Sequence, residues 1–443
     1  MLGRNSQRLL SHIRSRLTHS SIMTSSPKHC TVGRKSRLFA VESNCYSNDF
    51  YFTSTGSGYQ IPSVTATDWP MLADGGCAYS VCITIGPRVR AARLHKSLGQ
   101  QLSELFHGSQ VFNLMSYVPG NLHGSLEKGF LVLDPRCVPD TENRLYSILR
   151  EYKQDIQLCS YREGEGGQVW QCWWDLNGGA KEIERSPVMR MDTVMPSPFV
   201  DNIKGSAVFY SLEDACAVLQ ESSTVIPEAK MVLQLMGQNK TPERGHFPII
   251  VLEGLDATGK STLAEALKSH LKATLLISPP ECIQRWKKLF VEETTLIKRA
   301  YYALGNYIVT VEIAKASQMA PVIVDRFWHS TAAYAIATEI GGGVHNLPVH
   351  HHEIYSWPDD LLKPDLIILL TVSDEERIRR IRKRGRPETP DEMKLEANMT
   401  YRQKVEEAYR RMENPGCVII DASSPKETVL QEALCIIKEH CGI

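Results

Sequence analysis

The sequence has no long apolar run, no surplus of charge of either sign, and no cysteines in the close pairs that zinc sites use. No run approaches the roughly eighteen apolar residues of a membrane-spanning helix, so we expect no integral membrane association. Lys plus Arg and Asp plus Glu both total 50, so the net charge gives no reason to expect a nucleic acid as partner. Any site for an anion must therefore be local.

The twelve cysteines are scattered singly along the chain and do not show the spacing of a disulfide framework. We therefore expect reduced thiols in an intracellular compartment. The residues concerned are Cys30, Cys45, Cys77, Cys82, Cys137, Cys159, Cys172, Cys216, Cys282, Cys417, Cys435 and Cys441.

Acidic residues are absent from the first 41 positions, where arginine, lysine and serine recur. On a helix, Leu2, Leu9, Ile13 and Leu17 form an apolar stripe with arginines beside it. This composition is typical of a mitochondrial transit peptide, and we expect residues 1–41 to be one. The alternative is a disordered basic tail with no particular partner.

The middle of the chain, residues 42–238, combines short apolar runs such as "YSVCITIG" and "GFLVLDP" with turn signals and one amphipathic run, "YSLEDACAVLQES". These patterns predict a mixed α+β domain whose function the residues do not indicate. The polar segment 239–245 that follows is typical of a linker. A third region, 246–443, comes after it.

The third region opens with the full G-x-x-x-x-G-K-[ST] pattern in "EGLDATGKST", between a β-branched apolar run and a helical pattern. The glycines let backbone amides turn toward a phosphate, Lys260 supplies a point charge, and Ser261 is placed to bind a metal ion. The pattern predicts a nucleoside triphosphate site made of Gly254, Leu255, Asp256, Ala257, Thr258, Gly259, Lys260, Ser261 and Thr262.

Five apolar strand candidates alternate with helical patterns from here to the end: "FPIIVLEG", "ATLLIS", "PVIVD", "DLIILLTV" and "CVIID". This alternation predicts an α/β domain, with a parallel sheet as the middle of three layers and a ligand crevice at the carboxyl ends of the strands. Asp325 ends the third candidate and Arg326 follows it, so a carboxylate for Mg²⁺ and a guanidinium for a second phosphate lie together.

A basic run, "EERIRRIRKRGRPETPDEMK", precedes a loop that contains glycine and proline. Most of its arginines are expected on a solvated helix face. The cradle itself carries no cation besides Lys260, so two or three of these arginines are expected to meet the charge on a transferred phosphoryl group.

At these residues the chain resembles the thymidylate kinase family of nucleoside monophosphate kinases, through "EGLDATGKST", "DRFWHS", "KPDLIILLTVSDEER", the arginine-rich lid and "IDASSPKE". The resemblance implies ATP as donor, with Mg²⁺ held by Ser261 and Asp325. It also implies that Asp256 reaches the acceptor sugar and Arg326 the acceptor phosphate. The arginines implied at the donor phosphates are Arg380, Arg382 and Arg384.

The chain departs from the thymidylate pattern on its long central helix. Asn306 and Tyr307 stand where thymine-selecting members carry Asn and Arg, and Ala303 stands at the position of a stacking aromatic. We expect Asn306 and Tyr307 to contact the acceptor, which the resemblance then implies is a pyrimidine nucleoside monophosphate: CMP, UMP or a deoxy form.

Two alternatives remain at this point. The chain could be a thymidylate or deoxynucleoside kinase, or a scaffold protein whose kinase domain binds nucleotide but turns over slowly. The oligomeric state is open, a homodimer included.

Overall fold

The computed structural model describes residues 37–42, 50–54, 76–106, 110–138, 140–177, 181–190, 198–237, 243–384 and 390–443. Residues 1–36 of the expected leader lie outside this set, as do residue 238, residues 239–242 of the expected linker and 385–389 of the lid loop. The last five residues assigned to the leader, Arg37–Val41, form the first strand, β1. No described helix is long and apolar enough to cross a bilayer.

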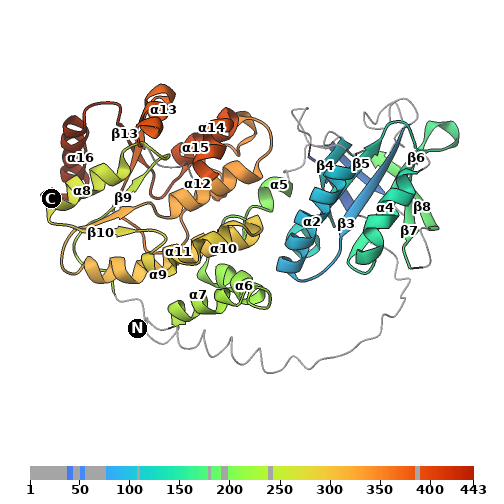
Figure 1. Cartoon of the computed structure of the whole chain (residues 1–443), viewed down its shortest axis with the longest axis horizontal. Helices are drawn as coiled ribbons and strands as arrows, with labels where there is room; N and C mark the ends of the chain where they lie inside the picture. The colour runs from blue at the N-terminus through green and yellow to red at the C-terminus, as the bar shows by residue number, and fades with distance from the viewer. Residues whose placement is uncertain are drawn as a thin grey trace. The chain divides into compact units, whose positions relative to one another are not determined.

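The described strands before residue 198 pair antiparallel and close into a barrel in the order β1-β2-β8-β7-β6-β3-β5-β4 (Figure 1). Besides β1, they are β2 (Phe50–Ser54), β3 (Cys77–Ile83), β4 (Val111–Tyr117), β5 (Glu127–Asp134), β6 (Ile156–Glu163), β7 (Val169–Asp175) and β8 (Lys181–Arg190). The helices among them are α2 (Arg88–Phe106), α3 (Leu122–Ser125) and α4 (Thr141–Leu149).

Side-chain alternation along β3 explains both faces of the barrel wall. Ala78 and Cys82 join the interior cluster that includes Phe52 and Tyr161, whereas Tyr79 and Val81 pack with residues of α2 and α4. The expected mixture of strands and helices is therefore present, but the strands form a closed barrel. The short apolar runs predicted strands, whereas closure of the barrel depends on which strands pair.

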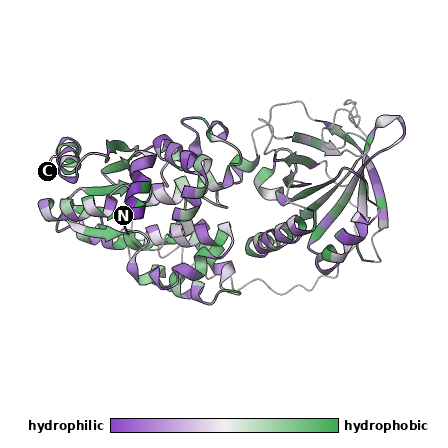
Figure 2. Ribbon diagram, turned by 45° about the horizontal axis from the view of Figure 1, so that its top comes forward, coloured by the Kyte–Doolittle hydropathy of each residue, from purple (hydrophilic) through white to green (hydrophobic). Residues whose placement is uncertain are grey.

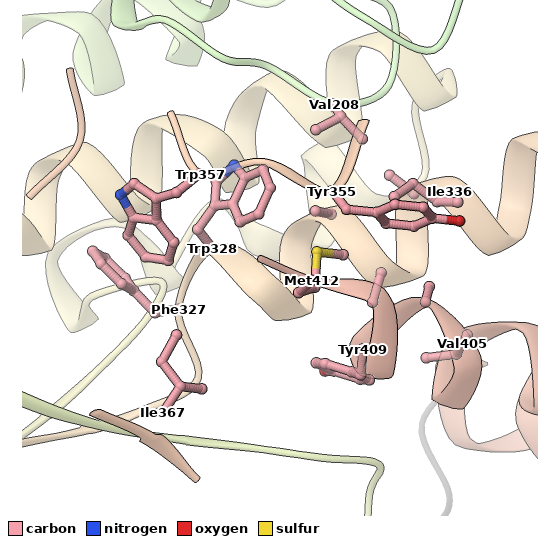
Figure 3. Packing of buried hydrophobic residues seen from close by; sticks show 14 of the residues in the cluster. Val208, Phe327, Trp328, Ile336, Tyr355, Trp357, Ile367, Val405, Tyr409 and Met412 are labelled. Atoms are coloured by element: carbon pink, nitrogen blue, oxygen red, sulfur yellow. The ribbon is translucent and has the colours of Figure 1, made fainter. Parts of the chain in front are cut away.

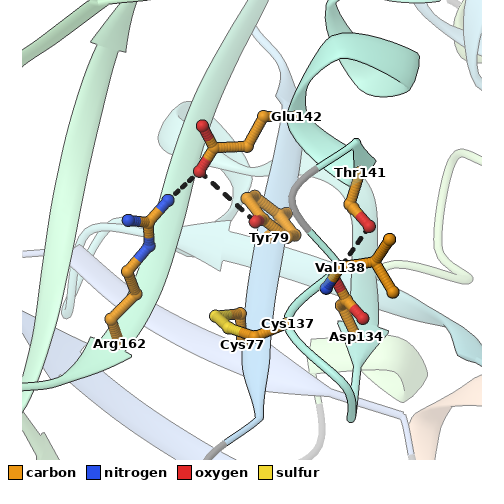
Figure 4. The surroundings of a disulfide bond; sticks show 8 residues. All are labelled: Cys77, Tyr79, Asp134, Cys137, Val138, Thr141, Glu142 and Arg162. Carbon is orange, nitrogen blue, oxygen red and sulfur yellow. Dashed lines mark hydrogen bonds and ion pairs between the residues drawn. A yellow bond between two sulfur atoms is a disulfide. The ribbon is translucent and has the colours of Figure 1, made fainter.

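Cys77 and Cys137 form a disulfide, with their Cα atoms 5.2 Å apart (Figure 4). The expectation that all cysteines are reduced is therefore wrong for this pair. Cys77 pairs across the sheet with Asp134, and Cys137 follows three residues later in the turn that begins there. Strand pairing thus brings together two thiols 60 positions apart, which no local spacing reveals.

The C-terminal sheet is parallel, with strand order β10-β11-β9-β12-β13, and all five predicted strands are present. They are β9 (Ile249–Glu253), β10 (Thr274–Ile277), β11 (Val322–Asp325), β12 (Leu366–Thr371) and β13 (Val418–Asp421). The helices after β9 are α8 (Lys260–Leu271), α9 (Glu281–Gln284), α10 (Lys287–Val291), α11 (Thr295–Ala316), α12 (Trp328–Glu339), α13 (Asp374–Lys383), α14 (Pro390–Ala397), α15 (Met399–Arg411) and α16 (Lys426–Cys441).

Helices cover both faces of this sheet, as the apolar strands predicted. Ile250 and Leu252 of β9 pack with α8 and α16, whereas Ile249 and Val251 pack with α11, α12 and α15. Figure 2 shows the sheet strands as largely hydrophobic ribbon. This arrangement is the three-layer α/β fold, and it places the carboxyl ends of β9 and β11 side by side.

The segment 198–237 differs from the expected domain plan. Its helices are α5 (Pro198–Asp201), α6 (Leu212–Ser222) and α7 (Glu228–Gly237). Val218 and Val232 share one buried cluster with Leu304 of α11, and Val208 lies in the cluster on the α11–α12 face of the sheet (Figure 3). The apolar face of the predicted amphipathic run thus completes the core of the C-terminal fold.

Candidate active site

The loop from Gly254 to Gly259 joins β9 to α8 and has the backbone of a phosphate cradle. Gly254 and Gly259 adopt φ values of 136° and 100°, in the left-handed region that favours glycine. A Cβ at Gly254 would also lie 2.4 Å from the carbonyl oxygen of Leu370. Glycine at 254 is therefore required both by the backbone and by the close approach of β12.

Lys260 is the first residue of α8, and its side chain lies under the loop. Its Nζ donates to the carbonyl oxygens of Leu255 at 2.7 Å and Gly254 at 3.1 Å. Burial, reinforced by the charge of Arg326, lowers the pKa of Lys260 from 10.5 to about 7. The ammonium is thus held where the cradle backbone turns, at the amino-terminal end of a helix.

Ser261 and Asp325 are brought together from two elements. The Ser261 hydroxyl donates to Asp325 Oδ2 at 2.9 Å, and Asp325 Oδ1 is buried with no hydrogen-bond partner among the described residues. A hydroxyl beside an unpartnered carboxylate oxygen is a suitable donor set for Mg²⁺, which takes one or two protein ligands and completes its shell with water and phosphate. The described residues contain no cluster of three or more metal-binding side chains.

Arg326 points back at the cradle. Its Nη2 lies 2.8 Å from Asp256 Oδ1, and its Nη1 donates to the carbonyl oxygen of Gly254 at 2.9 Å. Burial raises the pKa of Asp256, but the charges of Arg326 and Lys260 outweigh burial and leave that pKa below its usual value. The Asp-Arg pair of the sequence therefore lies directly across from the phosphate loop.

A carboxylate that sequence reasoning missed, Glu253, organises this side of the site. It ends β9, is fully buried, and accepts from the backbone N–H groups of Phe327 at 2.9 Å and Ser330 at 3.1 Å. The Ser330 hydroxyl donates to its other oxygen at 2.5 Å, with the Tyr409 hydroxyl 3.4 Å away. Burial raises the pKa of Glu253. The signal in the sequence was an acidic residue that closes an otherwise apolar strand.

The lid arginines do not share one position. Arg380 donates to the carbonyl oxygens of Thr258 at 3.1 Å and Ala422 at 2.6 Å, so it joins the cradle to the loop after β13. Arg384 pairs with Glu392 at 3.0 Å, and Arg382 is exposed. Of the three, Arg380 hydrogen-bonds to the cradle backbone, and Arg384 lines the cleft beside the cradle, where its charge helps to lower the pKa of Asp256.

Asn306 and Tyr307 face different surroundings. Asn306 is buried between two hydroxyl groups. The Ser278 hydroxyl donates to Asn306 Oδ1 at 2.6 Å, and Asn306 Nδ2 donates to the Thr331 hydroxyl at 3.1 Å. Tyr307 instead donates to Asp360 at 2.5 Å, and burial together with that carboxylate raises its pKa. Asn306 thus lies at the interface of α11 and α12, while the Tyr307 hydroxyl is engaged by Asp360.

A cleft of about 1020 Å³ runs beside the cradle, between α8, α13 and the loop after β13. Thr258 and Gly259 line it together with Arg380, Ser424 and Lys426. Its size suits a nucleotide, and its position matches the crevice at the carboxyl ends of parallel strands.

The site combines a phosphate cradle and its lysine with a hydroxyl bonded to a carboxylate and an arginine that faces the cradle. Together with the fold, it defines a P-loop kinase of the nucleoside monophosphate class. The family model described as thymidylate kinase matches residues 252–433. Human mitochondrial UMP-CMP kinase 2 is 47% identical over 372 residues, which cover 82% of this chain and 83% of the relative. The chain belongs to the UMP-CMP kinase 2 family.

More distant relatives match the C-terminal region. A thymidylate kinase of Bradyrhizobium diazoefficiens is 34% identical over 205 residues, covering 42% of this chain and 86% of that protein. A solved thymidylate kinase of Candida albicans aligns at 22% identity and a TM-score of 0.34, covering 44% of this chain and 92% of the other.

Proposed function

We propose that this nucleoside monophosphate kinase transfers the γ-phosphate of ATP to CMP, UMP and their deoxy forms in mitochondria. One observation carries the proposal: Arg326 and Lys260, from separate elements, both bond to the cradle backbone at Gly254. Two cations at Gly254 support a site in which the phosphates of the donor and of the acceptor nucleotide lie next to each other. The printed name of the human relative and the acid-free leader support the pyrimidine acceptors and the location.

The reaction needs positioning and charge rather than a general base. The attacking oxygen belongs to a phosphate whose second pKa is about 6, so it is already largely ionised at neutral pH. The proposed roles are Lys260 and the loop amides on the donor, Arg326 on the acceptor phosphate, and Asp256 on the acceptor sugar.

Ser261 and Asp325 would hold Mg²⁺, which when bound neutralises charge on the donor phosphates. Arg380 is the lid residue best placed to act on the same phosphates, since it already bonds to Thr258. Arg384 lines the same cleft and is proposed to act with Arg380 there. Arg382 is exposed, and its role at the donor phosphates stays a prediction.

A thymidylate acceptor is less well supported. Ala303 is buried at the position of the expected stacking ring, and the Tyr307 hydroxyl is bonded to Asp360. Neither residue offers the aromatic stack or the arginine that the thymine pattern requires.

A substrate panel tests the proposal. The full-length protein, with saturating ATP and Mg²⁺, is assayed with CMP, UMP, dCMP, dUMP, dTMP and unphosphorylated deoxycytidine. We expect the highest kcat/KM for the four cytosine and uracil monophosphates, and no turnover in a Lys260→Ala variant. A preference for dTMP or for the nucleoside would refute the acceptor assignment, and turnover too slow to separate from the variant would favour the scaffold alternative.

A further inference from the structure

Arg377, on the lid helix α13, is the most unusual charged residue in the described part of the chain. Its side chain is 1% exposed, and none of its three guanidinium nitrogens has a hydrogen-bond partner among the described residues. The other buried cations there all have partners: Lys260 and Lys404 donate to backbone carbonyls, Arg402 pairs with Asp374, and Arg299 donates to Tyr334 and Thr338.

The guanidinium of Arg377 lies behind the phosphate loop. It lines a small cavity together with Gly254, Leu255 and Thr258 of the loop, on the side where the end of β12 and helix α15 pack. The space amounts to about 10 Å³, close to the minimum that holds one water molecule. Arg377 and the cradle therefore line the same small cavity, which is distinct from the cleft beside α8.

The acids near Arg377 do not hydrogen-bond to it in the described part of the chain. Glu406 lines the same cavity, but no ion pair joins it to Arg377 in the described structure. Burial and the nearby Asp374 raise the pKa of Glu406, while Arg402, Arg410 and Arg377 lower it, and the net shift is upward. Asp374 is already paired with Arg402. Glu406 thus acts on Arg377 through its charge, but no hydrogen bond satisfies the Arg377 guanidinium among the described residues.

A buried unpaired guanidinium destabilises a fold, and an apolar side chain of similar volume would serve packing better. A buried guanidinium without a partner is therefore expected to have a role other than packing. The anion that the cradle binds provides one, because a fixed charge in a water-poor interior acts strongly on a neighbouring anion.

We propose that Arg377 is a positioning residue for the donor nucleotide: its buried charge, in the cavity that Gly254 and Leu255 also line, strengthens binding of the ATP triphosphate. Arg380, on the same helix, bonds to Thr258 of the same loop. Helix α13 thus supports the cradle at two points. The proposal concerns the donor half of the site alone, so it does not depend on which monophosphate is the acceptor.

The test uses the full-length protein with Arg377→Met, which keeps most of the volume and removes the charge, and Arg377→Lys, which keeps the charge. Arg90→Met is the matched control, since Arg90 is exposed on α2 and paired with Asp155. For each variant we would measure the ATP dissociation constant by calorimetry, KM for ATP and for CMP, and Tm without nucleotide.

We expect Arg377→Met to weaken ATP binding at least about tenfold, to leave KM for CMP unchanged, and to keep or raise the Tm. Arg377→Lys should retain most of the ATP affinity, and Arg90→Met all of it. An unchanged ATP dissociation constant in Arg377→Met would overturn the proposal. Equal losses for ATP and CMP with a lower Tm, and no rescue by lysine, would also overturn it and assign Arg377 to folding. Neither result bears on the acceptor panel, so the two proposals fail separately.

Discussion

The Ser261 hydroxyl and the Asp325 carboxylate, 64 positions apart, are joined by a 2.9 Å hydrogen bond between the start of α8 and the end of β11. The parallel pairing of β9 with β11 sets this distance, because it aligns the loop after one strand with the end of the other. The fold of the sheet thus holds the two proposed magnesium ligands beside each other.

Asp325→Asn should preserve this hydrogen bond in part and remove the charge that attracts the metal ion. We expect kcat/KM to fall about 10²–10³-fold, with partial recovery at high Mg²⁺ concentration. A Mg²⁺ titration of activity checks this, and Ser261→Ala should show a smaller shift in the same direction. A variant whose Mg²⁺ dependence matches the wild type would rule out Asp325 as a ligand.

Lys260 predicts how stability depends on pH. Its pKa in the folded protein is about 7 against 10.5 for an ordinary lysine, so above pH 7 the unfolded chain binds a proton that the folded protein does not. The free energy of unfolding should then rise with pH from about 7 toward 10, by up to about 1.4 kcal/mol per pH unit. Below pH 7 the contribution of Lys260 should not change with pH.

Lys260→Met should remove this pH dependence, stabilise the nucleotide-free protein near pH 7 and abolish turnover. Urea unfolding of both proteins at several pH values between about 7 and 9 measures the difference. If the unfolding free energies of the wild type and the variant changed with pH in the same way, Lys260 would be fully charged in the folded protein.

Glu253 should act through Arg326. Glu253→Ala leaves the N–H groups of Phe327 and Ser330 without their partner, which costs about 2–4 kcal/mol and loosens the start of α12 beside Arg326. We expect a larger rise in KM for the monophosphate than for ATP. Tyr409→Phe keeps the Glu253 carboxylate and removes the contacts of the Tyr409 hydroxyl to Ser330 at 2.8 Å and to Glu253 and Arg326 at 3.4 Å each. It is the milder variant, at about 1–2 kcal/mol. Equal changes in both KM values would contradict this role.

The segment 198–237 predicts where an independent kinase fragment must begin. Tyr210 donates to the carbonyl oxygen of Ile354 at 2.6 Å, and Asp360 accepts from the backbone N–H of Leu212 at 2.8 Å. We expect residues 198–443 to be soluble and active, and residues 243–443 to aggregate or melt at a clearly lower temperature. Soluble yield and Tm of the two fragments decide this, and equal behaviour would show that α6 and α7 are dispensable.

The sequence predicted the C-terminal fold well because its strands are buried on both faces and so appear as continuous apolar runs. The cradle was visible because Gly254, Gly259 and Lys260 have few other uses at that spacing. The position of Asp325 at a strand end was enough to place it beside Ser261.

The remaining features depend on contacts between distant segments. The amphipathic pattern of α6 shows that one of its faces is buried. It does not show whether that face packs on the strands before it or on the C-terminal fold after it, where α6 in fact packs. The direction of the Tyr307 side chain depends on Asp360, and the burial of Arg377 depends on α15. The barrel and the Cys77–Cys137 pair likewise follow from strand pairing, which alternation alone leaves open.

The order of the core elements along the chain bears on biosynthesis. Helix α7 ends at Gly237 and α11 begins at Thr295, so α7 is synthesised 58 residues before the helix that covers it, and α6 is synthesised earlier still. At about 5–20 residues per second, that interval lasts roughly 3–12 seconds. During it the nascent chain presents surface that chaperones recognise, and slower translation of residues 238–294 would prolong that exposure.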